Sequence, residues 1–152
     1  MTPQQSSKHP KHYASKFRVY RGANYNFVAP ASVIVPFDTV DFDVLNEFDE
    51  AVTYTFTPNE AGFYLLSAFV EIIAFPVGAV AQLFIVDETV GPTRSLTTFE
   101  NQSNLAHRQT LTTTVIAQIL AGNIYSVRFN CTANVVLRGL MDYNGFSMVR
   151  VG

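Results

Sequence analysis

The stretch Gly62–Ala74, which reads GFYLLSAFVEIIA, decides the fold of this chain. It is rich in β-branched and aromatic residues, which favour a strand over a helix. Successive side chains of a strand point to opposite faces, and here both faces are largely apolar. One face carries Tyr64, Leu66, Ala68, Val70, Ile72 and Ala74, and the other carries Phe63, Leu65, Ser67, Phe69, Glu71 and Ile73. An antiparallel strand normally has one solvated face. We therefore expect a second sheet to cover one face and another subunit to cover the other.

The composition favours a single all-β domain that is partly buried by partners. The chain has 152 residues, with 13 Phe and 7 Tyr, and such a length suits one domain. Only 14% of the residues are charged, against about 25% in typical soluble domains. No run of 18 apolar residues occurs, so we expect no membrane insertion. The first residues lack the apolar stretch of a secretory signal, so either the protein is used without secretion or a signal was removed before Met1.

Charge is distributed unevenly along the chain. Five of the ten basic residues lie in the first 21 positions, and no acid precedes Asp38. We predict a basic arm over residues 1–15 and a jelly-roll domain over residues 16–152. The arm is interpreted in three ways: a solvated tail, a nucleic-acid contact that the net charge of −2 disfavours, or a device that docks on an acidic protein such as a capsid component. The docking residues would be Lys8, Lys11, Lys16 and Arg18.

The rest of the chain divides into short strand-like runs between turn signals. A tight hairpin turn is expected at Ala121-Gly122-Asn123, and another turn at Asp142–Gly145. No helix is predicted, and eight to ten short antiparallel strands indicate a sandwich or jelly roll. The candidate strands are 16–21, 31–37, 51–57, 62–74, 79–87, 94–99, 109–120, 123–132, 134–141 and 145–151.

Several motifs together resemble a known superfamily. They are Val35–Asp38, the stretch Tyr54–Tyr64 that reads YTFTPNEAGFY, Leu120–Asn123 and the closing Phe146-Ser147. This pattern resembles the globular head of the complement q subcomponent and its tumour-necrosis-factor-like relatives over roughly residues 17–152. The resemblance implies a ten-stranded antiparallel jelly-roll sandwich that forms a homotrimer and acts by binding. The chain departs from the pattern at Asn123, where an acid is usual, and at Met148, where Gly is common.

The resemblance also implies which side chains meet in the trimer. Matching the motif at Gly62 places the odd-numbered face of the long strand at the interface, and the even-numbered face in the subunit core. The opposite assignment stays open, because a one-residue slip exchanges the two faces. The predicted interface residues are Phe63, Leu65, Ser67, Phe69, Thr112, Ile116 and Phe146.

The sequence offers little catalytic or metal-binding chemistry. Six acids lie between Asp38 and Glu50, and closely spaced carboxylates can bind calcium, although three interleaved Phe residues favour an ordinary loop. The three His and the lone Cys131 are scattered and form no zinc pattern. No nucleophile motif or phosphate loop is present. We expect no cofactor, with calcium as the alternative, and no enzymatic activity.

Two functions remain open at this point. The first is a structural and recognition module on a virion, such as a phage head fibre, a capsid decoration protein or a tail-associated protein, attached by its arm. The second is a soluble, secreted-type extracellular trimer that recognises a receptor or glycan. In either case the outward loops near Phe75–Ala79 and Asn101–Arg108 are expected to contact a host receptor or glycan.

Overall fold

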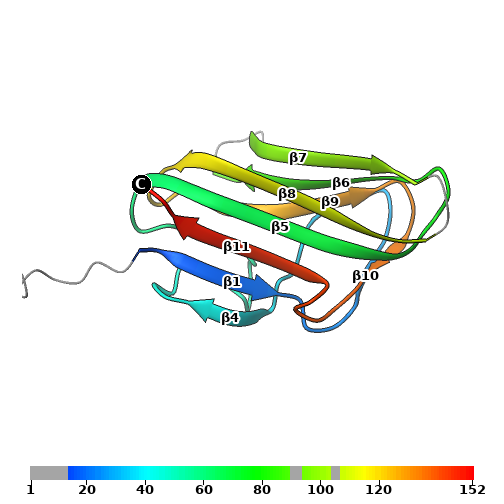
Figure 1. Ribbon diagram of the computed structural model, residues 1–152, viewed down its shortest axis with the longest axis horizontal. Helices are drawn as coiled ribbons and strands as arrows, with labels where there is room; N and C mark the ends of the chain where they lie inside the picture. Colours follow the sequence, from blue (N-terminus) through cyan, green and yellow to red (C-terminus); the bar gives the residue numbers. More distant parts are fainter. Residues whose placement is uncertain (1–13, 90–93, 104–106) are drawn as a thin grey trace, which may run out of the picture.

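Strands alone build the described part of this chain, in two stacked layers (Figure 1). The structure is a computed structural model that describes residues 14–89, 94–103 and 107–152. Every strand pairing is antiparallel. The predicted all-β jelly-roll sandwich is therefore confirmed. No helix of the described residues is long and apolar enough to span a membrane.

The larger sheet has seven strands, and the long strand β5 lies at its centre. One edge of β5 pairs with β11 and β10, and the other edge pairs with β8. The path of the sheet is β2-β10-β5-β11-β1-β4. The strands are β1 (Lys16–Tyr20), β2 (Tyr25–Phe27), β4 (Thr39–Asp43), β5 (Gly62–Phe75), β8 (His107–Ile119), β10 (Val135–Leu137) and β11 (Asn144–Arg150).

The smaller sheet has four strands and covers one face of the larger sheet (Figure 1). Its order is β3 (Ser32–Ile34), β9 (Tyr125–Cys131), β6 (Val80–Asp87) and β7 (Arg94–Gln102). Strands β7 and β8 close the sandwich on one side, where the hydroxyl oxygens of Thr97 and Thr113 lie 2.9 Å apart.

The core lies between the layers and takes the even-numbered face of β5. Tyr64, Leu66, Val70 and Ile72 are all fully buried, whereas the odd-numbered positions up to Phe69 remain partly or largely exposed. The even-numbered face is therefore the core face, as predicted, and the role of the odd-numbered face in the trimer stays a prediction.

Phe146 was assigned wrongly to the interface, because it belongs to the core. Its ring is 0% exposed and lies 5.1 Å from the ring of Phe17 and 6.1 Å from that of Phe37, measured between centroids. In the register of β11 with β5, Phe146 is opposite the core residue Ala68, and its neighbour Ser147 is opposite Ser67. Alternation along the strand therefore places Ser147, and not Phe146, on the outer face.

Nine of the ten predicted runs contain a strand, and the run 51–57 does not. There the carboxylate of Asp49 accepts hydrogen bonds from the backbone N–H groups of Ala51, Val52 and Thr53 and forms a turn. The strands β2 and β4 were not predicted, so the described residues hold eleven strands and not ten. Strand β4 lies in the acidic segment, which was interpreted as a loop because it contains Asp41 and Asp43.

Candidate assembly surface

The surface with the strongest indication of function is the face of the larger sheet that points away from the core. We call it the outer sheet face and define it by the odd-numbered positions of β5 from Phe63 to Phe69 and the residues opposite them on β8 and β11. Leu65, for example, lies opposite Ile116 on one side and Val149 on the other. The members are Phe63, Leu65, Ser67, Phe69, Thr112, Thr114, Ile116, Gln118, Gly145, Ser147 and Val149.

None of these eleven side chains is charged, and the largest of them reach into solvent. Ile116 is 63% exposed and Phe63 is 51% exposed, while Leu65, Phe69 and Val149 are half-buried. Full burial of one such side chain stabilises by about 1.5–3 kcal/mol. The charge depletion together with exposed apolar area is typical of the centre of a protein–protein interface.

Neighbouring strands hold the side chains of this face in place. The ring of Phe69 lies over Gly145, where an added Cβ would come within 3.0 Å of ring atom Cε1, so the glycine makes room for the ring. The hydroxyl oxygens of Ser67 and Thr114 lie 2.9 Å apart. Both polar groups at the centre of the face therefore have a partner within the subunit, which lowers the cost of burying them.

Strand β1 forms a charged border on one side of the outer sheet face. Lys16 lies opposite Val149, and Arg18 lies opposite Ser147; Arg18 also pairs with Asp41 at 3.9 Å. A hollow of about 190 Å³ lies where Lys16, Phe42 and Leu65 meet. Lys16 and Arg18 therefore lie in β1 beside the apolar face, as the predicted strand 16–21 indicated, and they do not belong to the arm to which the docking role was assigned. Lys8 and Lys11 lie outside the described residues.

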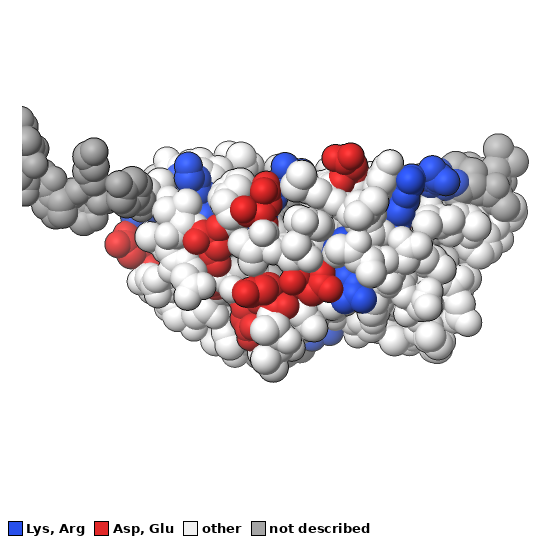
Figure 2. Space-filling view, turned by 90° about the horizontal axis from the view of Figure 1, so that it is seen from below, with Lys and Arg blue, Asp and Glu red and all other residues white. Residues whose placement is uncertain are grey.

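Acidic side chains gather on the side of the molecule formed by β4 (Figure 2). Asp38 and Asp43 hold neighbouring loops in place through hydrogen bonds. Asp38 accepts a hydrogen bond from the N–H of Gly22, and Asp43 accepts hydrogen bonds from the N–H groups of Glu47 and Phe48. Glu47 is buried, accepts a hydrogen bond from Ser15, and also accepts from the N–H of Asn59 at 2.6 Å. Charged residues on an edge strand also discourage pairing with other sheets.

The described part of the chain holds no group of three or more His, Cys, Asp or Glu placed to hold a metal ion. Cys131 is a buried free thiol in β9. Asp38, Asp43, Glu47 and Asp49 accept the local hydrogen bonds given above, and Asp41 pairs with Arg18. Calcium remains only the alternative that the spacing of the acids suggested.

The carboxyl of Asp49 should titrate far below its usual range. Its pKa falls from the ordinary 3.8 to about 2, chiefly because the Thr53 hydroxyl donates to it and then because three backbone N–H groups do so. A lowered pKa means that the charged form favours the folded turn. That stabilisation is present above pH 3.8 and is lost as the pH falls through about 2.

Carbon-detected NMR titration of the Asp49 carboxyl tests this prediction. The Thr53→Val variant should raise the pKa of Asp49, and the control Thr57→Val, which changes an exposed hydroxyl in the same segment, should leave it unchanged. An Asp49 pKa near 3.8 in the wild-type protein would contradict the described turn.

The segments predicted to face outward meet at Gly78 and Ser103, and residues 104–106 of the second segment lie outside the described residues. The N–H of Gly78 donates to the carbonyl of Ser103 at 2.8 Å, and the N–H of Ser103 donates to the carbonyl of Ala79 at 2.9 Å. Val77 at the tip is 65% exposed. This end of the sandwich is opposite the end that holds the start of β1 and the C-terminus (Figure 1).

Sequence reasoning missed five members of the outer sheet face: Thr114, Gln118, Gly145, Ser147 and Val149. The family resemblance placed Thr112 and Ile116 on this face, and period-2 alternation along the same strand would have added Thr114 and Gln118. The β11 residues were missed because the phase of that strand was set at Phe146, one residue from the correct position.

Solved structures with the same fold support the architecture. The crystal structure of murine APRIL at pH 5.0 matches with a TM-score of 0.72 and 11% identity over 91% of this chain and 100% of that one. Eiger TNF from S. frugiperda matches with a TM-score of 0.67 and 12% identity over 91% and 92%. The globular domain of zebrafish complement 1qA matches with a TM-score of 0.67 and 16% identity over 91% and 98%. No protein-family model and no curated protein sequence matches the chain.

Proposed function

Since the chain has the jelly-roll fold of tumour-necrosis-factor-like proteins and complement q globular heads, we propose that it is a homotrimeric, non-enzymatic binding module. The observation that carries the proposal is the outer sheet face, with eleven uncharged positions on three adjacent strands. A single sandwich leaves this face in water, and self-association removes its apolar side chains from solvent.

Charge placement around the face supports its role as an interface between copies of the chain. The uncharged positions occupy β5, β8 and β11, and charged residues border them: Lys16 and Arg18 on β1, and Glu71 further along β5, where it pairs with Arg108 on β8 at 3.1 Å. A central apolar patch with charges confined to the rim is the usual anatomy of an interface. Homo-oligomers close by symmetry, and a threefold arrangement lets one face serve three copies.

Native mass spectrometry of the full chain tests the stoichiometry. The expected species contains three copies of the 16.9 kDa subunit, about 51 kDa in total. A population of dimers or tetramers with no trimer would reject the threefold arrangement while leaving the fold intact.

Within this proposal the trimer is a virion surface component, and its basic segment attaches it to the particle. The first 21 residues carry five basic residues and no acid, so they complement an acidic capsid or tail surface. Three such segments on one base multiply weak contacts, and avidity gains reach about 10²–10⁴. The loops around Val77 and Ser103, at the other end of the sandwich, would then face outward to a host receptor or glycan (Figure 1).

Deleting residues 1–13 should yield a folded trimer that no longer incorporates into its particle. The deletion stops short of Ser15, because Ser15 is buried and its hydroxyl donates to Glu47. Incorporation is measured by complementing a particle that lacks the protein. A Thr57→Val control, at an exposed position outside the basic segment, should still incorporate. If the truncated trimer incorporates at the wild-type level, attachment through this segment is wrong.

The complement q globular fold also favours a second candidate, a soluble extracellular trimer that binds a receptor or glycan. The two functions share the trimer and differ in what the first residues do. Particle incorporation that depends on residues 1–13 supports the virion role, and glycan binding by the truncated trimer with no particle association supports the extracellular role.

A further inference from the structure

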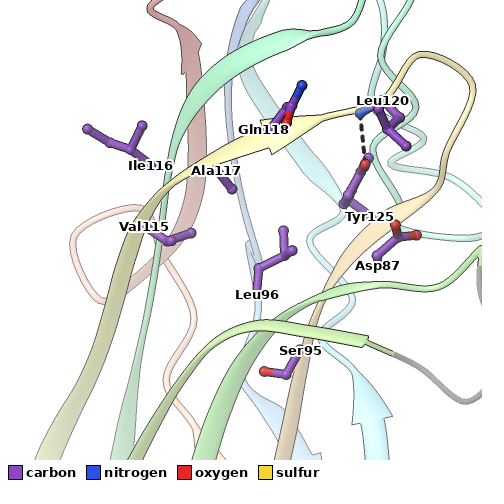
Figure 3. A pocket seen from close by; sticks show the side chains of 9 residues that line it. All are labelled: Asp87, Ser95, Leu96, Val115, Ile116, Ala117, Gln118, Leu120 and Tyr125. Atoms are coloured by element: carbon purple, nitrogen blue, oxygen red, sulfur yellow. Dashed lines mark hydrogen bonds between the residues drawn. The ribbon is translucent and has the colours of Figure 1, made fainter.

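A pocket of about 420 Å³ opens between the two layers, on the side where β7 and β8 close the sandwich. Figure 3 shows Val115 and Ala117 on β8, Leu96 on β7, and Asp87 and Tyr125 on the far side of the gap. Small-molecule sites have volumes of about 300–1,000 Å³ and combine apolar walls with a few polar groups. This pocket has both features within one subunit.

The pocket exists because the inward side chains of β8 are small at this level. Leu111 and Ile119, on the same face of β8, are fully buried, and between them lie Thr113, Val115 and Ala117. Of these, Val115 and Ala117 pack against the core yet stay partly exposed. Short side chains cannot fill the distance between two sheets, which pack about 10 Å apart. An apolar group from outside could therefore enter the gap.

A β-bulge turns Leu96 toward the same gap. The register of β6 with β7 pairs Ile85 with Thr97 and Val86 with Ser95, so Leu96 is an extra residue with no partner of its own. Bulges redirect side chains and occur often beside functional sites. The displaced leucine forms, with Val115 and Ala117, an apolar floor contributed by both sheets.

The opposite wall carries a nearly buried carboxylate. Asp87 is 7% exposed; its Oδ1 accepts from the N–H of Thr89 at 2.9 Å and its Oδ2 accepts from Nδ2 of Asn123 at 3.1 Å. Both donors are neutral, and a carboxylate offers about four lone-pair sites. The hydroxyl of Tyr125 accepts from the N–H of Leu120 at 3.0 Å and adds a second polar group (Figure 3).

We propose that this pocket binds a small primary amine that carries an apolar body of about one ring. The ring packs on Leu96, Val115 and Ala117, and the ammonium group donates to the carboxylate of Asp87. Charge complementarity selects the amine, because hydrogen bonds to ionised groups are roughly twice as strong as neutral ones. The same carboxylate repels an anion. Ile116 and Gln118 of the outer sheet face also line the pocket, but the three apolar contacts and the carboxylate proposed here all lie within one subunit.

Benzylamine is the probe that tests the site, with the full chain observed through its methyl signals by NMR. Titration should shift the methyl signals of Leu96, Val115 and Ala117 to saturation. Benzyl alcohol, which has the same ring and no charge, should bind at least about tenfold more weakly, since a charge-assisted hydrogen bond is replaced by a neutral one. Benzoate should produce no saturable shift.

Two variants complete the test. Ala117→Phe should fill the gap and abolish benzylamine binding while the protein stays folded, and the control Ala51→Phe, in an exposed turn, should bind as the wild type does. Asp87→Asn should reduce the preference for benzylamine over benzyl alcohol. The proposal is overturned if the wild-type methyl signals do not move, if benzoate binds as well as benzylamine, or if the Ala117→Phe variant still binds.

Discussion

Replacing Leu65 with Asp is expected to dissociate the trimer into monomers that keep their β-sheet structure. Leu65 is half-buried at the middle of the outer sheet face, between Ile116 and Val149. In the assembled state the new carboxylate would be buried without a partner, and uncompensated buried charge costs several kcal/mol per ion. The monomer leaves the carboxylate in water. Gel filtration with light scattering measures the loss of mass, and circular dichroism measures the retained sheet.

The neighbouring substitution Leu66→Asp provides a matched control of the same chemistry on the other face. Leu66 is fully buried in the subunit core, so this variant should fail to fold. The pair distinguishes assembly from folding, because only one of the two residues lies between the sheets. A Leu65→Asp protein that remains trimeric would show that the outer sheet face is not the interface.

Replacing Phe146 with Ala should destabilise the subunit by about 3–5 kcal/mol, the usual cost of removing a core aromatic side chain. The ring contacts Phe17 edge-on at 5.1 Å and also lies near Phe37 and Phe48, at 6.1 and 6.2 Å. Its loss leaves a cavity between the sheets. Denaturant unfolding at a fixed protein concentration measures the free energy, because oligomer stability depends on concentration.

Ser147→Ala is the control for this prediction, since Ser147 follows Phe146 and points to the outer sheet face. It should change the free energy of unfolding of the subunit little. If Phe146→Ala instead weakened assembly and left the stability of the subunit unchanged, the original assignment of Phe146 to the interface would be restored.

The fold was predictable because long runs of alternating side chains specify it. In β5 the aromatic and β-branched residues identified the strand, and its two apolar faces indicated cover on both sides. Short strands carry too few residues for such a pattern. Strand β2 has three residues, Tyr25–Phe27, and it is held by pairing with β10, a contact that is distant in sequence.

The candidate surface was predicted in part, and the errors have a common cause. Alternation fixes which residues share a face within one strand, but register between strands comes from pairing across the sheet. This is why Phe146 was placed on the wrong face.

The motif Asp142–Gly145 was expected to be an ordinary turn, yet Asn144 is buried and its Nδ2 donates to the carbonyls of Arg21, Arg138 and Leu140. No local sequence pattern predicts these hydrogen bonds of the Asn144 side chain.

The pocket beside β7 and β8 was not predictable from the sequence. It depends on a one-residue bulge at Leu96 and on small side chains at two inward positions of β8. Ala117 and Val115 are ordinary strand residues in the sequence. Only the distance between the two layers turns them into the wall of a cavity.

Sedimentation equilibrium of the wild-type protein tests the central claim most directly. The claim is that the uncharged outer sheet face joins three copies of this sandwich. At micromolar concentration the account predicts a single species of about 51 kDa, three times the 16.9 kDa of the subunit. A species of 16.9 kDa at that concentration would mean that the exposed Phe63 and Ile116 face water in solution, and it would contradict the proposed assembly.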